Sequence, residues 1–162
     1  MKVVVQRVTR AGVRIDGESV ASIGSGMLLL LGVLQGDGEP QAQRLAERVA
    51  RFRFFPDARG RMHFSALEVG AQALVVSQFT LAADGRAGRR PSFERAAPRD
   101  LAESLYLSFL DTLEGLGLTC ASGRFGAQME VELVNDGPVT FLLEESGPPH
   151  GGVGPGAPEK QK

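Results

Sequence analysis

The stretch from Met27 to Leu34 is apolar throughout except for Gly32, and it constrains the fold more than any other part of the sequence. It is bounded by four glycines, Gly24, Gly26, Gly36 and Gly38. A short continuous apolar run between glycine-rich breaks is typical of a strand buried in the middle of a sheet. Its uninterrupted part, Met27–Leu31, has five residues, whereas a membrane-spanning helix needs roughly 20. The sequence therefore predicts a domain organised around a buried central strand.

Further strands and two helices are predicted around this strand. The segments 3–8, 73–81, 118–122, 128–134 and 139–144 favour strands, and Asp16-Gly17 favours the turn of a hairpin over 13–23. Helices are expected over 39–54 and 101–116, because apolar residues recur there every three or four positions. Strands and helices do not strictly alternate. We therefore expect an α/β protein of the α+β type, with a mixed, mainly antiparallel sheet or barrel and two main helices on one side.

The length of the chain and the character of its ends predict one folded domain. The chain has 162 residues, which fits a single domain, and we assign it to residues 1–146. Nine of the 16 residues in 147–162 are glycine or proline, which predicts a disordered tail. The N-terminal apolar segment is too short for a signal peptide, so we expect a cytoplasmic protein with no membrane contact.

The formal net charge of −1 conceals a strong asymmetry. Residues 1–99 carry 15 basic and nine acidic side chains, whereas residues 100–146 carry one basic and nine acidic. Arginines gather in 44–61 and in 86–99. Arginine suits phosphate geometry, but a solvated helix face and a solvated loop explain the same pattern. Charge alone leaves both interpretations open.

Few side chains are available as acid, base, nucleophile or metal ligand. Cys120 is the single cysteine, which excludes an intramolecular disulfide and a multi-cysteine metal site. It lies in an apolar segment, so we interpret it as buried rather than reactive. Of the two histidines, His150 falls in the predicted tail, and nothing links His63 to a hydroxyl nucleophile. If the chain is an enzyme, backbone dipoles or a group of the substrate must supply the chemistry.

Two polar segments stand out between the apolar ones. Ser77–Leu81 closes a predicted buried strand with three hydrogen-bonding side chains, which indicates either a substrate pocket or local backbone capping. Asn135–Thr140 contains Gly137-Pro138 and is either a plain turn or a rigid cis Gly–Pro wedge. Since only about 5–6% of X–Pro bonds are cis, the residues alone do not decide between these.

Five segments together resemble the D-aminoacyl-tRNA deacylase (DTD) family. They are Val-Val-Gln-Arg-Val at 4–8, Ser-Gln-Phe-Thr-Leu at 77–81, Gly-Arg-Arg-Pro-Ser-Phe at 88–93, Gly-Arg-Phe-Gly-Ala-x-Met at 123–129 and Asn-Asp-Gly-Pro-Val-Thr at 135–140. They occur in order, at compatible spacings, and span about residues 1–145. A related tRNA deacylase family has a Pro-Gln-Ala-Thr-like segment, so Ser-Gln-Phe-Thr favours the D-specific family. The resemblance implies a DTD-like fold.

The resemblance also implies a homodimeric hydrolase that uses no metal and no cofactor. Such enzymes cleave the ester between a D-amino acid, or glycine, and the 3′-terminal adenosine of tRNA. Gly137-Pro138 would be the Gly-cisPro motif of the family, which reaches across the dimer into the partner's site and excludes L-amino acids by steric clash. Arg7 matches an arginine expected to hold this motif in orientation.

Roles around the ester follow from the same resemblance. The site would be lined by Ser77, Gln78, Phe79 and Thr80, with backbone N–H groups near Gln78 and Phe79 as oxyanion donors. Thr80 matches a residue once regarded as the nucleophile. Because no general base accompanies it, we expect the 2′-hydroxyl of the terminal ribose to assist the attack instead. Phe125 and Met129 match positions expected to hold the terminal adenine.

Two rival functions stay open on the sequence. One is a non-catalytic RNA-binding or interaction module on the same fold, which would use the arginine-rich loop 86–99. The other is a small-molecule esterase or amidase, which would cleave free D-aminoacyl esters as well as charged tRNA.

Overall fold

A computed structural model describes residues 1–86 and 88–146 of the chain, so the predicted tail, 147–162, lies outside the described residues. Six strands form one sheet: β1 (Lys2–Ile15), β2 (Glu18–Ile23), β3 (Gly26–Gly32), β6 (Gln72–Ser77), β7 (Thr119–Ser122) and β8 (Glu130–Glu144). Their order is β2-β1-β3-β6-β7, with β8 paired to β1. The pairs β3–β6 and β6–β7 are parallel and the other three are antiparallel. The predicted mixed, mainly antiparallel sheet is confirmed.

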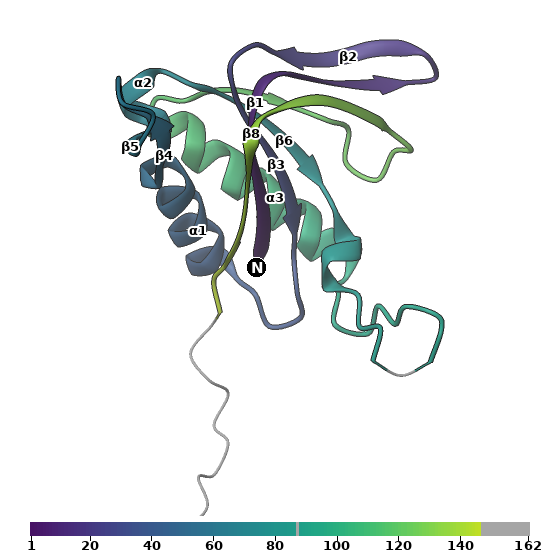
Figure 1. The fold of residues 1–162 in the computed structure, drawn as a ribbon. Coiled ribbons are helices and arrows are strands. Elements are labelled where there is room, and N and C mark those ends of the chain that lie inside the picture. Colours follow the sequence, from purple (N-terminus) through teal and green to yellow (C-terminus); the bar gives the residue numbers. More distant parts are fainter. Residues whose placement is uncertain (87, 147–162) are drawn as a thin grey trace, which may run out of the picture.

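Strand β1 organises this sheet, because it pairs with three other strands. Its first half lies between β3 and β8, and its second half lies between β2 and β8. The sheet therefore curls on itself into a partly closed, barrel-like shape (Figure 1). The hairpin turn falls at Asp16 and Gly17, whose φ angles of 51° and 81° are those of a tight hairpin turn, as the sequence predicts.

Apolar residues cover both faces of the central strand β3. Met27, Leu29 and Leu31 pack into a core with the helices α1 (Glu39–Arg51) and α3 (Arg99–Gly115). Leu28 belongs to a second core, between β3, β6 and the folded-over half of β1. Figure 1 shows α1 and α3 together on one side of the central strands. Burial on both sides explains why the run is continuous rather than alternating.

The structure differs from the prediction between α1 and β6. The first helix ends at Arg51 rather than near residue 54, and a hairpin of β4 (Arg53–Pro56) and β5 (Met62–Ser65) follows, with the short helix α2 (Ala66–Val69). Phe54 is fully buried and packs against Phe141 of β8 at 5.9 Å between ring centroids. Tertiary packing of these aromatic rings therefore overrides the helical period at the end of α1.

Two further boundaries differ in ways that matter for function. The predicted strand 73–81 ends at Ser77, which pairs with Leu31 near the end of the partner strand β3. The 3₁₀ turn η1 (Phe79–Ala82) follows. The segments predicted as separate strands, 128–134 and 139–144, are two halves of β8. No helix within the described part of the chain is long and apolar enough to cross a membrane.

Candidate active site

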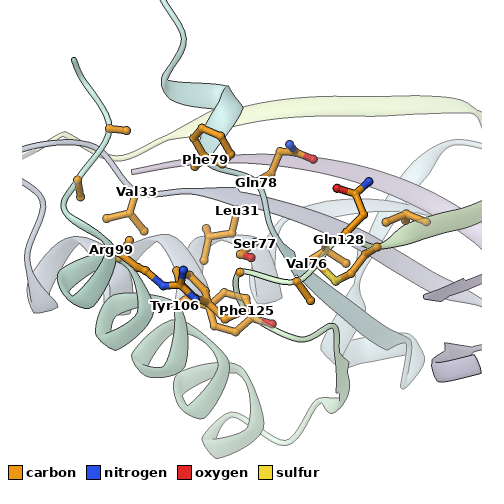
Figure 2. A pocket seen from close by; sticks show the side chains of 17 residues that line it. Leu31, Val33, Val76, Ser77, Gln78, Phe79, Arg99, Tyr106, Phe125 and Gln128 are labelled. Atoms are coloured by element: carbon orange, nitrogen blue, oxygen red, sulfur yellow. The ribbon is translucent and has the colours of Figure 1, made fainter. Parts of the chain in front are cut away.

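A pocket of about 710 Å³ opens where β6 gives way to η1. Its floor includes Leu31 and Val76 from the central strands, and Ser77, Gln78 and Phe79 come from the turn. Further walls come from the start of α3 and from the loop 123–129. In the view of Figure 2, Phe79 and Gln78 lie on one side of the hollow and Tyr106 and Phe125 on the other, with Ser77 between them. This volume is in the range of small-molecule sites.

The turn that contributes to this lining also carries backbone hydrogen-bond donors. The amide of Gln78 donates to the carbonyl of Leu31 at 2.7 Å and is thereby engaged. The amides of Phe79 and Thr80 stand at the start of η1, where a helical turn supplies no partner of its own. The geometry therefore removes the Gln78 amide from the expected oxyanion donors and leaves that of Phe79.

A close approach of β3 to η1 fixes the position of the turn. A Cβ atom built on Gly32 would lie 2.8 Å from Cβ of Leu81 and 3.1 Å from the carbonyl oxygen of Gln78. Only a glycine lets the backbone come this near. The glycine that interrupts the apolar run is thus a determinant of the site, which the sequence pattern alone does not reveal.

Thr80 lies next to the pocket rather than in its lining. Its side chain is exposed, and its hydroxyl oxygen accepts a hydrogen bond from the side-chain amide of Gln78 at 2.5 Å. No hydrogen bond among the described residues joins this hydroxyl to a histidine or carboxylate. The arrangement orients Thr80 but supplies no base to activate it.

The described lining of the pocket holds no side chain that titrates near neutral pH. Its ionisable members are Arg99 and Tyr106. Tyr106 is buried and donates its hydroxyl to the carbonyl of Val75 at 3.0 Å, and burial raises its pKa to about 12. His63 stands on β5 against Phe64 and is not part of the lining. None of the described lining side chains is therefore suited to acid–base catalysis near neutral pH.

The described residues also offer no grouped metal ligands and no activated thiol. Within 1–86 and 88–146 no three His, Cys, Asp or Glu side chains gather so as to hold a metal ion. Cys120 is half-buried on β7, and burial raises the pKa of its thiol to about 11. A thiol with a raised pKa is protonated at neutral pH and a weak nucleophile, although Cys120 is half-buried and not fully buried as the sequence predicts.

The loop 123–129 brings two further predicted residues to the pocket. Phe125 and Met129 both line it, and the Phe125 ring lies 5.7 Å from that of Tyr106, measured between centroids. The sulfur of Met129 lies against Gly123, 2.6 Å from where a Cβ atom would be. Phe125 and Met129 thus add apolar surface to the pocket lining, and the Phe125 ring is large enough to contact a flat ring.

The Gly137-Pro138 peptide bond is cis, in agreement with the sharper of the two interpretations of this segment. Four residues of β8, 136–139, lie opposite the single residue Arg7 of β1, so the segment bulges out of the sheet. Gly137 and Pro138 are exposed at the tip of the bulge. Neither residue lines the pocket of its own chain. The structure thus separates them from Ser77, Phe79, Phe125 and Met129.

Two side chains hold the base of this bulge. Arg7 donates from Nε to the carbonyl of Asp136 at 3.1 Å and from Nη1 to the carbonyl of Phe54 at 2.7 Å, and it pairs with the Asp136 carboxylate at 3.0 Å. Asn135 donates from Nδ2 to the carbonyls of Arg7 and Val139, and its Oδ1 accepts from the amide of Val139. The orientation of the bulge is therefore fixed by hydrogen bonds on both sides.

An arginine-rich loop lies beside the pocket mouth. Its residue Phe93 packs against Phe79, with 5.0 Å between ring centroids, and both rings are exposed. Asp84 and Ser92 pair backbone to backbone at its base, and Arg86 holds the pKa of Asp84 well below its usual range. The loop is thus tied to the turn that carries the candidate oxyanion donor.

Comparison with known proteins identifies the family. The sequence model described as D-Tyr-tRNA(Tyr) deacylase matches residues 4–144. The chain belongs to this family. The predicted family resemblance is therefore confirmed, and with it the expectation of a hydrolase that acts on aminoacyl-tRNA.

Curated relatives of this deacylase family are similar over nearly their whole length. A D-aminoacyl-tRNA deacylase of Syntrophotalea carbinolica is 58% identical over 144 residues, which cover 89% of this chain and 97% of the relative. One of Roseiflexus castenholzii is 52% identical over 146 residues, covering 90% and 93%.

Solved structures agree with the deacylase fold. A structure titled "c-Myc DNA Unwinding Element Binding Protein" is 39% identical, with a TM-score of 0.85, covering 91% of this chain and all of that one. A probable eukaryotic D-amino acid tRNA deacylase is 15% identical and has a TM-score of 0.77 over 88% of this chain and 97% of its own. The second supports the fold alone.

Titration of Tyr106 tests the burial of the pocket wall. It is the single tyrosine of a chain without tryptophan, so tyrosinate absorbance reports on it directly. We expect ionisation near pH 12 in the folded protein and near the ordinary value of 10.0 after denaturation. Because the folded-state pKa is the higher one, its contribution to the free energy of unfolding is complete below pH 10 and is lost between pH 10 and 12. Ionisation near pH 10 with an intact circular-dichroism spectrum would contradict the buried position.

Proposed function

We propose that this protein hydrolyses the ester bond between a D-amino acid and the 3′-terminal adenosine of tRNA, and that it also hydrolyses glycyl-tRNA. The observation that carries the proposal is a pocket lined by Phe79, whose backbone amide makes no hydrogen bond within residues 1–86 and 88–146, and by no side-chain base among the described residues. Membership of the deacylase family supplies the substrate class. The proposed reaction uses no metal or cofactor and takes place in the cytoplasm, where charged tRNA is found.

The proposed chemistry depends on the backbone and on the substrate. Water adds to the ester carbonyl, and the amide of Phe79 stabilises the negative oxygen that forms. The bond to the ribose 3′-oxygen then breaks and that oxygen takes up a proton, which gives free D-amino acid and tRNA. The adjacent 2′-hydroxyl of the terminal ribose relays the proton, because no pocket side chain is suited to do so. Ser77 and Gln78 position the ester at the turn.

The apolar wall of Phe125 and Met129 is proposed to hold the terminal adenine. Both residues line the pocket, and Phe125 lies on the side away from Phe79 in the view of Figure 2, where its ring is available for stacking. An adenine held there leaves its ribose and ester directed toward Ser77 and Phe79. This arrangement selects for the tRNA terminus over a free aminoacyl ester, because the base contributes contact area that a small ester lacks.

Discrimination against L-amino acids is proposed to come from a second copy of the chain. Gly137 and Pro138 are presented at the tip of a rigid bulge, yet they lie outside the pocket of their own chain. Leu142 on the same strand is 56% exposed, as expected of a surface that a partner covers. In a homodimer the bulge enters the partner's pocket and rejects an L-side chain by steric clash. Such rejection treats all D-amino acids alike, and glycine passes because it has no side chain.

A second candidate function is a non-catalytic nucleic-acid-binding module. The neighbour that is 39% identical carries a title that describes binding to a DNA unwinding element. The exposed arginines beside the pocket mouth, Arg89, Arg90 and Arg95, are suited to phosphate contact. This candidate predicts binding of tRNA without ester hydrolysis.

Deacylation of D-Tyr-tRNA and L-Tyr-tRNA at matched enzyme concentration tests the proposed function. We expect rapid hydrolysis of the D-ester and a rate for the L-ester that is at least about a hundredfold lower, since a steric clash of a few kcal/mol is enough for this ratio.

Arg7→Ala releases the bulge and should raise the L-ester rate while the D-ester rate changes little. Hydrolysis of neither ester would favour the binding module, and equal rates for the wild type would refute the wedge. Equal cleavage of free D-tyrosyl esters would instead indicate a small-molecule esterase.

Thr80→Ala tests whether the threonine hydroxyl is the nucleophile. The hydroxyl lies outside the lining and accepts from Gln78, so we expect kcat/KM for D-Tyr-tRNA to stay within about tenfold of the wild type. Loss of a true nucleophile costs roughly 10⁴-fold or more. A loss of that size in a variant with an unchanged melting temperature would show that Thr80 attacks the ester.

A further inference from the structure

Arg99 is a pocket residue with no role in the reaction as proposed above. It is the first residue of α3, and it lines the pocket together with Ala102 and Tyr106. The spacings of three and seven residues place these side chains on one face of the helix. Figure 2 shows the Arg99 side chain reaching toward the hollow from the start of α3, on the same side as Tyr106 and Phe125 in that view.

The guanidinium of Arg99 is held against the loop that carries Phe125. A Cβ atom built on Gly126 would collide with Nη2 of Arg99, and it would lie 3.0 Å from Cζ and 3.5 Å from Nη1. Gly126 has a φ of +72°, which favours glycine on backbone grounds as well. The planar group therefore lies on a glycine surface next to the wall assigned to the adenine.

The charge of Arg99 has no carboxylate partner among the ion pairs of residues 1–86 and 88–146. Those ion pairs do use Arg7, Arg44, Arg53, Arg61 and Arg86. Arg99 remains exposed to solvent. It is also the one charged side chain in the described lining, since Tyr106 stays protonated below about pH 12. An unpaired arginine in a pocket wall is suited to an anionic group of the ligand.

The chemistry of the proposed substrate limits what that anion is. The amino acid end carries an ammonium group, which a neighbouring guanidinium repels. The adenine and ribose are uncharged. The negative group nearest to the ester is the phosphate on the 5′ side of the terminal adenosine. Resting on the proposed function, we propose that Arg99 binds this phosphate and thereby sets the direction in which the tRNA strand leaves the pocket.

The position of Arg99 also defines that direction. The loop that precedes α3 carries Arg89, Arg90 and Arg95 on exposed positions. A strand whose last phosphate lies on Arg99 passes next along this loop, where further phosphates find further cations. The terminal adenosine is thus anchored at both ends, with its base on the Phe125 wall and its phosphate on Arg99.

Two minimal substrates that differ by one phosphate test this inference. They are 2′(3′)-O-D-tyrosyl-adenosine and the same ester carrying a 5′-phosphate. For the wild type we expect the KM of the phosphorylated ester to be about tenfold lower, since a hydrogen bond to a charged group contributes on this scale. In Arg99→Ala the two KM values should become equal while kcat is retained. Arg99→Lys keeps the positive charge but loses the bidentate geometry of the guanidinium. It should therefore restore part of the difference between the two KM values.

Arg51→Ala is the matched control, because it removes an exposed arginine of α1 that is not part of the pocket lining. It should preserve the wild-type KM ratio. With D-Tyr-tRNA, the dependence of log KM on log salt should become shallower by about one for Arg99→Ala. A KM ratio unchanged in Arg99→Ala, or both KM values rising together, would overturn the phosphate assignment and leave the proposed function intact. A wild type that cleaves neither ester nor D-Tyr-tRNA would overturn both.

Discussion

The parallel pairing of β3 with β6 is the constraint on which the site depends. Both strands are buried on both faces, and their register brings Leu31 opposite Ser77 where both strands end. Gly32 then allows η1 to lie directly on the end of β3. The position of the Phe79 amide is thus fixed by backbone packing between two rigid strands, rather than by the side chain of any catalytic residue.

A site built in this way explains the scarcity of acid–base groups. Backbone amides need no ionisation and no rotamer choice, and they act on the charge that develops in the transition state. In the proposed function, what the pocket provides is position: an apolar wall at Phe125, an anion contact at Arg99 and an excluding wedge from the partner subunit. Arg7 and Asn135 would serve the wedge, since they hold a bulge whose residues Gly137 and Pro138 lie outside the lining of their own pocket. The two-subunit arrangement proposed here separates catalysis from discrimination.

The sequence predicted the sheet class, the two main helices and the hairpin at Asp16-Gly17. With the family resemblance it also named five residues that line the pocket, Ser77, Gln78, Phe79, Phe125 and Met129, whose roles stay predictions. These signals are local, either a period or a motif. It did not predict β4 and β5, because burial of Phe54 depends on contacts with Phe141, distant in the chain. The sequence also did not identify Tyr106 and Arg99 as pocket residues. It assigned Tyr106 to the apolar stripe of a helix and Arg99 to a group of loop arginines. Which residues of α3 line the pocket depends on how this helix packs against the loop 123–129. The hydrogen bond of the Gln78 amide to the carbonyl of Leu31 depends on the register between β6 and β3. No local sequence pattern encodes this register.

In the proposed reaction the reacting proton is handled by the substrate and not by the protein. The most direct measurement compares deacylation of D-Tyr-tRNA ending in adenosine with that of D-Tyr-tRNA esterified on the 3′-hydroxyl of a terminal 2′-deoxyadenosine. We expect the deoxy substrate to bind with similar affinity and to be hydrolysed at least about a hundredfold more slowly, the lower end of what proton transfer contributes. Hydrolysis of the deoxy substrate at the full rate would contradict it.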